Sequence, residues 1–476
     1  MSRTRSLLCV LPLLLAPWAC AAAQGRPEVL AQALLDALHE TSGVPGLGAA
    51  VWQDGRLRWQ GQAGWQDLTA QRPLGPDTRF RLASVSKLFT ATAAAQLHQE
   101  GRLHGEAPLP QPWYPADHPG ARITLRQLAA HTSGLPHYEL RDLVRGGQAF
   151  PDSRSAARHW LNERALRDEP GRSYHYSSWG YTLLGATIEQ ASNLPLDRYF
   201  EARLTQGLAI GVDRTDTDRD GHSRPYEAGA RGWRLASAHD YSYSLGGAGL
   251  SATPGALAQW GGRLLQGQLI DADTLAWMMR PSRLADGSPV RHDGANLVAF
   301  GWRLRDDPQG RPTWFHNGSA VGARSALVLW PGAPATAAAL LSNAAWVSAI
   351  DDSARTLAAV FLPETGKPPT SPWVCPAAGQ RFTGRWGNQA LQGTVKDSPG
   401  VPGPCARHLQ LDHPPTGFDN QGPPRAAVAL RLIALPSASG VVRAGLATPI
   451  GLFMLDAAGA GLLRGKVAGR DWEMRW

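Results

Sequence analysis

The chain has 476 residues, of which 43% are hydrophobic and 18% are charged, with 47 basic and 39 acidic side chains. This length exceeds what one hydrophobic core usually supports, and the composition is that of a globular chain and not a disordered one. The basic residues are nearly all arginines, scattered along the chain without a basic run, so we expect no nucleic-acid partner.

Residues 1–23 have the features of a secretory signal peptide. Arg3 and Arg5 precede the apolar run 7–18, and the small residues 19–23 offer cleavage sites. The apolar run is too short to span a membrane. A lipid anchor at Cys20 is less favoured, because the residues before it fit a lipoprotein signal poorly. We therefore expect a secreted or periplasmic protein with no integral membrane span.

Cleavage of that segment would leave two cysteines, Cys375 and Cys405. In an oxidising compartment such a pair is more often a disulfide than a metal site. We therefore predict a disulfide between them, and neither a metal nor another cofactor.

Hydrophobic periodicity predicts an α+β domain over residues 24–362. A dipeptide typical of hairpin turns, Asp54-Gly55, separates the first two predicted strands. Helices are predicted at 27–41, 84–97, 123–131, 181–191, 254–265 and 352–361, and strands at 47–52, 57–63, 299–304, 313–316, 325–330 and 336–341. Strands at both ends with helices between them fit a single antiparallel sheet flanked by helices.

The composition changes after this domain. Residues 363–377 are rich in Pro, Thr and Ser and are typical of a linker. Short, mostly alternating runs follow at 382–386, 409–411, 428–432, 441–446, 450–455 and 472–476. They predict a small all-β barrel or sandwich over 378–476.

The stretch with most chemical content is the start of the predicted helix 84–97, where Ser84 and Lys87 lie one helical turn apart. A serine hydroxyl needs a base, and a lysine can be that base only where burial or charge lowers its pKa. Lys87 is the only lysine before residue 367, and this is the only Ser-x-x-Lys in the chain. A chance match is an equally good explanation of so short a motif, so other parts of the sequence are needed to decide whether Ser84 and Lys87 are catalytic.

Three further stretches bear on the chemistry. Tyr176 lies in a predicted turn just before a helix, although a buried tyrosine is usually a core residue. His316-Asn317-Gly318 ends a predicted strand, where backbone N–H groups can face a pocket or simply be exposed. The run 131–136 ends a helix and is expected to be structural.

Together these stretches resemble the serine β-lactamase and penicillin-binding family, at its class C β-lactamase, D,D-carboxypeptidase and esterase end, over about residues 27–361. The resemblance implies Ser84 as nucleophile, Lys87 as its partner and Tyr176 as general base. It also implies that the backbone amides of Ser84 and Ser319 form an oxyanion hole. The substrate site that it implies consists of Ser178, His316, Gly318 and Ser319. The C-terminal segment is similar to the lipocalin-like domain of some members.

The resemblance implies a hydrolase that forms an acyl-enzyme with a small-molecule or peptide substrate. The motifs of two other hydrolase classes, Gly-x-Ser-x-Gly and His-Glu-x-x-His, do not occur in the sequence. Where many members have Tyr-x-Asn, this chain has Tyr176-Ser177-Ser178, and His316 replaces the Lys of Lys-Thr-Gly. Esters, amides or D-amino-acid peptides are therefore favoured over β-lactams. A class C-type β-lactamase and a catalytically weak binding protein are the alternatives.

His316 also leads to an expectation about the substrate. A histidine has an ordinary pKa near ~6.5 and is largely neutral at pH 7.5, so it attracts an anion weakly. We expect a preference for substrates without a carboxylate at that end. The natural substrate and the oligomeric state are left open.

One motif points elsewhere. Residues 216–221 with Glu227 match the ligand positions of an EF-hand calcium loop. Ser223 stands where such loops have an apolar residue, and Pro225 opposes a continuing helix. An acidic surface loop is the preferred interpretation.

Overall fold

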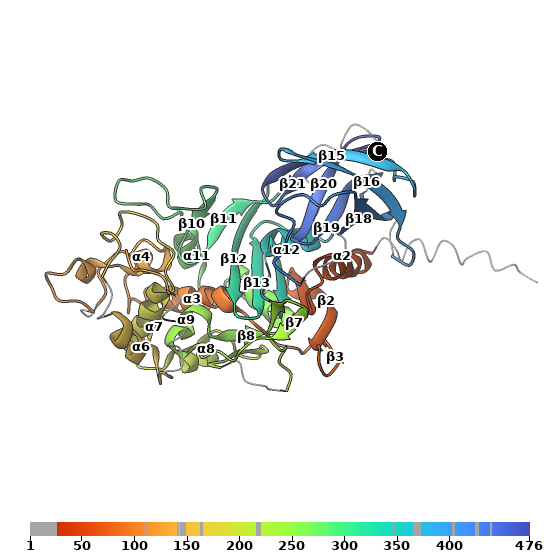
Figure 1. Cartoon of the computed structure of the whole chain (residues 1–476). Coiled ribbons are helices and arrows are strands. Elements are labelled where there is room, and N and C mark those ends of the chain that lie inside the picture. Colours follow the sequence, from red (N-terminus) through yellow and green to blue (C-terminus); the bar gives the residue numbers. More distant parts are fainter. Residues whose placement is uncertain are drawn as a thin grey trace, which may run out of the picture.

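The computed structural model describes residues 26–476, except 111–112, 140–141, 143–148, 162–164, 216–219, 347, 365–372, 402–404, 424–427 and 438–439. The predicted signal peptide, with Cys20, and much of the predicted linker lie outside the described residues. Figure 1 shows an α+β unit followed by a β-barrel, and both were predicted from the sequence.

A nine-stranded sheet forms the centre of the first unit, in the order β3-β2-β1-β14-β13-β12-β11-β10-β9. The N-terminal strand β1 pairs antiparallel with β14, which confirms that both ends of the unit contribute to one sheet. Its strands are β1 (Gly46–Gln53), β2 (Arg56–Asp67), β3 (Arg72–Pro73), β9 (Arg291–His292), β10 (Asn296–Val298), β11 (Arg303–Asp306), β12 (Pro312–Ala320), β13 (Ala323–Trp330) and β14 (Thr336–Ser342).

Two smaller sheets complete the unit. One has the order β4-β8-β5 and the other pairs β6 with β7. Their strands are β4 (Phe80–Arg81), β5 (Ile210–Val212), β6 (Tyr226–Gly229), β7 (Gly232–Leu235) and β8 (Leu250–Ala252).

The predicted strand at 299–304 is displaced from the observed one and overlaps it only at its last two residues, because β10 ends at Val298 and β11 (Arg303–Asp306) begins at Arg303. Between them, Gly301 has φ +87°, and a Cβ there would lie 2.5 Å from the Cβ of Ala91. The backbone therefore turns sharply against the central helix, and only glycine fits this close approach.

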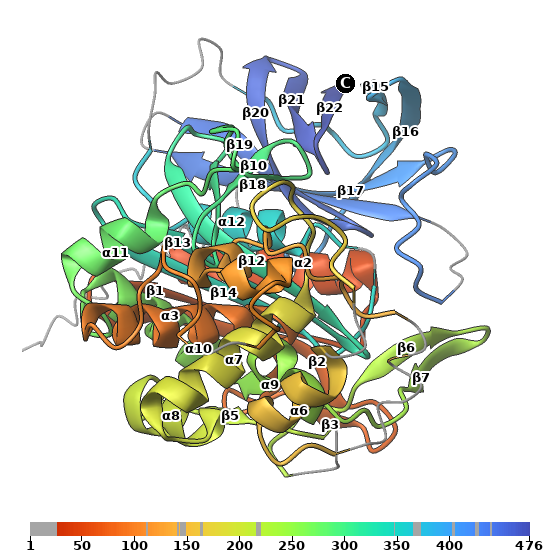
Figure 2. The same ribbon diagram turned by 90° about the vertical axis from the view of Figure 1, so that its left-hand side faces the viewer.

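Helices cover both faces of the large sheet (Figures 1 and 2). On one face, α2 and α12 pack against the strands, and on the other face α10 packs with α3 and α7 behind it. The helices are α2 (Pro27–Ser42), α3 (Ser86–Gln99), α4 (Leu125–Ala129), α6 (Ser153–Leu161), α7 (Ser178–Ser192), α8 (Leu196–Arg203), α9 (Leu245–Ala248), α10 (Pro254–Leu265), α11 (Ala272–Met279) and α12 (Ile350–Ala359). No helix in the described part of the chain is long and apolar enough to cross a membrane.

Helix α3 runs through the middle of the core. Twelve of its 14 residues are buried, including Lys87 in the first turn. A helix buried all round needs small side chains where its neighbours approach, and the alanines 93–95 supply them. The first turn of α3 is therefore closed off from water on most sides, which is what an amine with a lowered pKa requires.

The second unit is a closed eight-stranded barrel in which β15 pairs with both β16 and β22. Its strands are β15 (Arg381–Trp386), β16 (Gln389–Asp397), β17 (Ala406–Leu411), β18 (Ala429–Ser437), β19 (Gly440–Thr448), β20 (Gly451–Gly459), β21 (Leu462–Val467) and β22 (Arg470–Arg475). The sequence predicted six of these and missed β16 and β21. Large apolar side chains such as Trp386 and Trp472 are buried in one cluster, so the barrel has a packed core.

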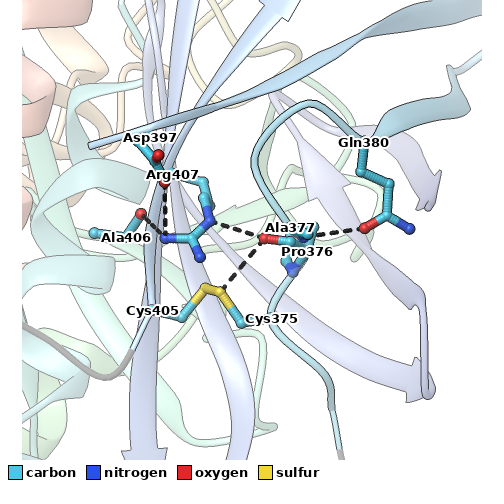
Figure 3. Close-up of a disulfide and its surroundings, with 8 residues drawn as sticks. All are labelled: Cys375, Pro376, Ala377, Gln380, Asp397, Cys405, Ala406 and Arg407. Carbon is cyan, nitrogen blue, oxygen red and sulfur yellow. Dashed lines mark hydrogen bonds and ion pairs between the residues drawn. A yellow bond between two sulfur atoms is a disulfide. The ribbon is translucent and has the colours of Figure 1, made fainter. Parts of the chain in front are cut away.

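The predicted disulfide is present. Cys375 and Cys405 are joined, with their Cα atoms 5.8 Å apart. Figure 3 shows that the bond ties the segment before β15 to the start of β17, and that Arg407 also donates to the Pro376 carbonyl, at 2.8 Å.

The barrel rests on α2 and α12, which lie between it and the large sheet (Figures 1 and 2). Barrel residues Ile433, Leu452 and Met454 join the same buried cluster as Leu34 of α2 and Leu357 of α12. The two units therefore share a continuous apolar core across these helices.

Candidate active site

The predicted nucleophile lies in a short turn between β4 and α3. Ser84 is the middle residue of the 3₁₀ turn η1 (Ala83–Val85), and the buried Ala83 before it has φ +47°. A non-glycine residue in this region is strained and persists only where the surroundings hold it. Ser325 of β13 donates to the Leu82 carbonyl at 2.5 Å and so holds the turn from the sheet.

Lys87 is fully buried and meets three oxygen atoms. Its Nζ lies 3.1 Å from Ser84 Oγ, 3.0 Å from Ser178 Oγ and 2.9 Å from the Gly247 carbonyl. A neutral amine has two N–H donors and one lone pair. When the Gly247 carbonyl and Ser178 Oγ take the donors, the lone pair faces Ser84. Burial lowers the pKa of Lys87, with a smaller contribution from the charge of Arg303, while Tyr176 opposes the shift.

Tyr176 approaches the same hydroxyl, and its Oη donates to Ser84 Oγ at 2.9 Å. Burial alone would raise the pKa of Tyr176, but the charges of Lys87 and Arg303 bring it below its ordinary value. The ring lies against His131, with centroids 4.2 Å apart. His131 in turn accepts the backbone N–H of Ser177, the residue that caps α7, at 3.1 Å.

The edge of β12 lies beside the nucleophile. Strand β11 pairs only with the first part of β12, up to Phe315, whereas β13 pairs with β12 as far as Ala320. A Cβ on Gly318 would lie 2.9 Å from the Ser84 amide nitrogen, so a glycine is needed there. Ser319 follows and is exposed. Its amide, with that of Ser84, is the oxyanion hole that the family resemblance implies.

His316 is buried, with 2% of its surface exposed, and its Nδ1 lies 2.6 Å from the Asn317 carbonyl. Burial, and then the charges of Arg303 and Lys87, hold its pKa well below the ordinary 6.5. The imidazole is therefore neutral at pH 7.5, as the sequence led us to expect.

Sequence reasoning missed the fixed cation of the site. Arg303, the first residue of β11, is buried, and its Cζ lies 5.9 Å from the centroid of the Tyr176 ring. Its Nη1 donates to Asn317 Oδ1 at 2.8 Å, and its side chain also hydrogen-bonds Tyr174. Among the described residues no carboxylate forms an ion pair with it. A buried cation without a carboxylate partner is costly, and it favours an anionic ligand.

A recess of about 250 Å³ opens beside Tyr176 and is lined by His137, Arg167, Tyr174, His175 and Tyr176. Arg167 is the arginine of this lining. The recess therefore places the charge of Arg167 close to Tyr176.

A second pocket, of about 320 Å³, includes Asp213, His222 and Ser251 in its lining. His222 Nε2 lies 3.0 Å from Asp213 Oδ2 and 3.5 Å from Ser251 Oγ. In a catalytic triad the acid and the serine contact different nitrogens of the imidazole. Here both contact the same nitrogen, so these residues are not a second triad.

No group of three or more His, Cys, Asp or Glu side chains that could hold a metal occurs in the described part of the chain. Residues 216–219 of the calcium-loop pattern lie outside that part. Glu227 lies on β6 and forms an ion pair with Arg234 at 2.7 Å.

Comparison with known proteins decides the family. The model of the Beta-lactamase family matches residues 31–361. The chain belongs to the Beta-lactamase family. It is 24% identical, over 67% of its length and 76% of the relative's, to the human serine beta-lactamase-like protein LACTB, mitochondrial.

Two solved structures extend the comparison. A D-stereospecific amidohydrolase from Streptomyces sp. is 25% identical, with TM-score 0.54 over 66% of this chain and 94% of its own. The octameric penicillin-binding protein homologue from Pyrococcus abyssi is 18% identical, with TM-score 0.55 over 91% and 97%. The family and the fold inferred from the sequence motifs are thereby confirmed.

Proposed function

We propose that this protein is an exported serine hydrolase that forms an acyl-enzyme on Ser84. The observation that carries the proposal is the meeting of Lys87 Nζ and Tyr176 Oη at Ser84 Oγ, at 3.1 and 2.9 Å. Export rests on the N-terminal signal pattern and agrees with the disulfide between Cys375 and Cys405.

The geometry supports a two-step reaction. The Lys87–Tyr176 pair takes the proton of Ser84, whose Oγ attacks the acyl carbon, while backbone N–H groups stabilise the oxyanion. Tyr176 then donates a proton to the leaving atom as the bond to it breaks. In the second step water attacks the acyl carbon and gives a proton to the pair, and the pair returns a proton to Ser84 Oγ as the ester bond breaks.

This mechanism also indicates where the leaving group binds. A general acid must lie within hydrogen-bond distance of the leaving atom, so the leaving group lies on the side of Tyr176. Arg303 lies beside the Tyr176 ring, and Arg167 lines the recess next to Tyr176. We therefore propose amide or peptide substrates of the D-amino-acid type whose leaving group carries a carboxylate. This replaces the expectation from His316 alone, which assumed that no fixed cation was present.

A first experiment tests the nucleophile. A fluorophosphonate probe should add one covalent label to the parent protein, as seen by intact mass, and none to Ser84→Ala. Label on Ser84→Ala would refute the assignment. A parent protein that is labelled but turns over none of the tested substrates would favour the alternative of a catalytically weak binding protein.

A second experiment tests the leaving group. An acylated D-alanyl-D-alanine peptide and the same peptide as its C-terminal amide differ only in the carboxylate. We expect the acid to have the higher kcat/KM, by about ten-fold, the value of one charge-assisted hydrogen bond. Arg303→Gln should remove the difference. If the parent prefers the amide, the carboxylate part of the proposal is wrong.

β-Lactam hydrolysis is the second candidate, because Arg303 could also receive the carboxylate of a penicillin or cephalosporin. Nitrocefin turnover above that of the D-alanyl peptide would favour it. We expect nitrocefin to be the slower substrate, because Ser178 stands where many family members have the Asn of Tyr-x-Asn.

A further inference from the structure

Asn317 lies between the fixed cation and a buried carboxylate. Its Oδ1 accepts from Arg303 Nη1 at 2.8 Å, and its Nδ2 donates to Asp351 Oδ1 at 3.2 Å. An amide has one acceptor end and one donor end, so these two partners fix how it is turned. It can bridge a guanidinium to a carboxylate without bringing the two charges into contact.

Asp351, in the first turn of α12, is itself held on its other oxygen. Oδ2 accepts from Arg355 Nη1 at 2.7 Å and from Arg305 Nη2 at 3.2 Å. Burial would raise the pKa of Asp351, but the charges of both arginines hold it below the ordinary value, so the carboxylate is ionised. Because Asp351 is part of α12, the position of its carboxylate depends on the position of that helix.

Helix α12 is in turn hydrogen-bonded to the barrel backbone. The Ala349 N–H donates to the Ile450 carbonyl at 2.7 Å, just before the helix begins. Ser353 Oγ accepts the Leu452 N–H at 2.9 Å, and Thr356 Oγ1 donates to the Leu452 carbonyl at 3.2 Å. A series of hydrogen bonds, together with the backbone of α12, therefore connects the barrel strand β20 to Arg303 beside Tyr176.

We propose that Asn317 and Asp351 are positioning residues for Arg303, and that the barrel, by holding α12, helps to align this cation for the carboxylate of the substrate. The inference rests on the proposed function, because it assigns Arg303 to the leaving group. Asp351 balances the charge of Arg303 only through the neutral amide, so the guanidinium keeps donors free for the substrate. A carboxylate at position 317 would occupy them.

Two variants of Asn317 test the first half. Asn317→Ala removes the hydrogen bond to the Arg303 guanidinium and so allows it to turn. Asn317→Asp places a carboxylate next to Arg303, with which it forms a direct ion pair. Each should raise KM for the D-alanyl-D-alanine acid about ten-fold, with a smaller effect on kcat and on the C-terminal amide. An equal rise in KM for the acid and for the C-terminal amide would show that Asn317 has only a structural role, and would overturn the inference.

Arg303→Gln separates this inference from the proposed function. If Arg303→Gln abolishes the preference for the acid but both Asn317 variants keep it, Arg303 binds the carboxylate without help from Asn317, and only the positioning role fails. If Arg303→Gln keeps the preference, the function assigned to Arg303 fails first, and the positioning role fails with it.

The barrel contact has a matched control. Thr356 of α12 and Thr41 of α2 are both buried, and the hydroxyl of each donates to a carbonyl of its own helix. Each hydroxyl also donates to a barrel carbonyl, which is that of Leu452 for Thr356 and that of Thr448 for Thr41. Replacing either by valine removes the hydroxyl and keeps the shape. Thr356→Val should raise KM for the acid about three-fold, and Thr41→Val should leave it within experimental error. Equal KM values in the two variants would overturn the role of the barrel.

Discussion

Gly318 offers a sharp test of how closely β12 and the nucleophile turn are packed. A Cβ at this position would lie 2.3 Å from Ser325 Oγ, 2.5 Å from the Leu82 carbonyl oxygen and 2.9 Å from the Ser84 amide nitrogen. Two of these three atoms belong to the backbone, so a side-chain rotation cannot relieve Gly318→Ala. The strand and the turn must move apart instead.

The size of the effect follows from that separation. Non-bonded contacts to a Cβ need about 3.4 Å, so the turn would shift by roughly 0.5–1 Å. A misplacement of about 1 Å at a reacting group costs on the order of 100-fold in rate, or about 2.7 kcal/mol. Overpacking should lower the free energy of unfolding by about 1–3 kcal/mol in addition.

Stopped-flow acylation by p-nitrophenyl acetate, together with urea unfolding, measures both quantities. Gly332→Ala is the control, because a Cβ there would meet no atom within 4 Å. We expect Gly332→Ala to match the parent in both assays. An acylation rate in Gly318→Ala within three-fold of the parent would show that Gly318 does not set the position of Ser84, and would refute this reasoning.

Three further predictions follow from the same contacts. Lys87→Arg keeps a charge but cannot give up a proton, so acylation should fall by at least ~100-fold in single-turnover assays; a loss of only a few-fold would remove Lys87 from the mechanism. Burial holds the pKa values of His131 and His316 well below 6.5. The unfolded chain therefore binds more protons as the pH falls below 6.5. Each histidine should lower the free energy of unfolding by up to about 1.4 kcal/mol between pH 7.5 and 5.5, which urea melts at both pH values would detect. Replacing Cys375 and Cys405 by serine opens a loop with a sequence separation of 30 and should destabilise the barrel by roughly 3–4 kcal/mol; an unchanged urea midpoint would contradict this.

Local signals predicted the parts of the fold that depend on neighbouring residues. Thr253 caps α10, which spans Pro254–Leu265 as predicted, because the hydroxyl of an N-cap and a proline after it act within one turn. Ser84 and Lys87 face each other for the same reason, since their spacing is that of one helical turn.

Contacts between residues far apart in the sequence account for the features that the sequence did not predict. Arg303 reaches the site because β11 pairs with β12, which places Arg303 opposite Phe315, the residue before His316. No spacing rule links these two positions. Strand β16 was missed because Gly393 and polar residues interrupt its alternation, although Leu391 and Val395 do point into the barrel core. The strained backbone of Ala83 also has no sequence signal, because it is imposed by tertiary contacts.

The site uses arginine and lysine for different purposes. Lys87 is the only lysine of the chain before residue 367, whereas the fixed charge that acts on it is that of Arg303. Arginine stays protonated even when buried, while the pKa of a buried lysine falls. At a pH where Lys87 has become neutral, Arg303 is still a cation. One pocket can therefore remove a proton from Ser84 and attract a carboxylate at the same time. Two lysines so close together would compete, because the charge of each would lower the pKa of the other.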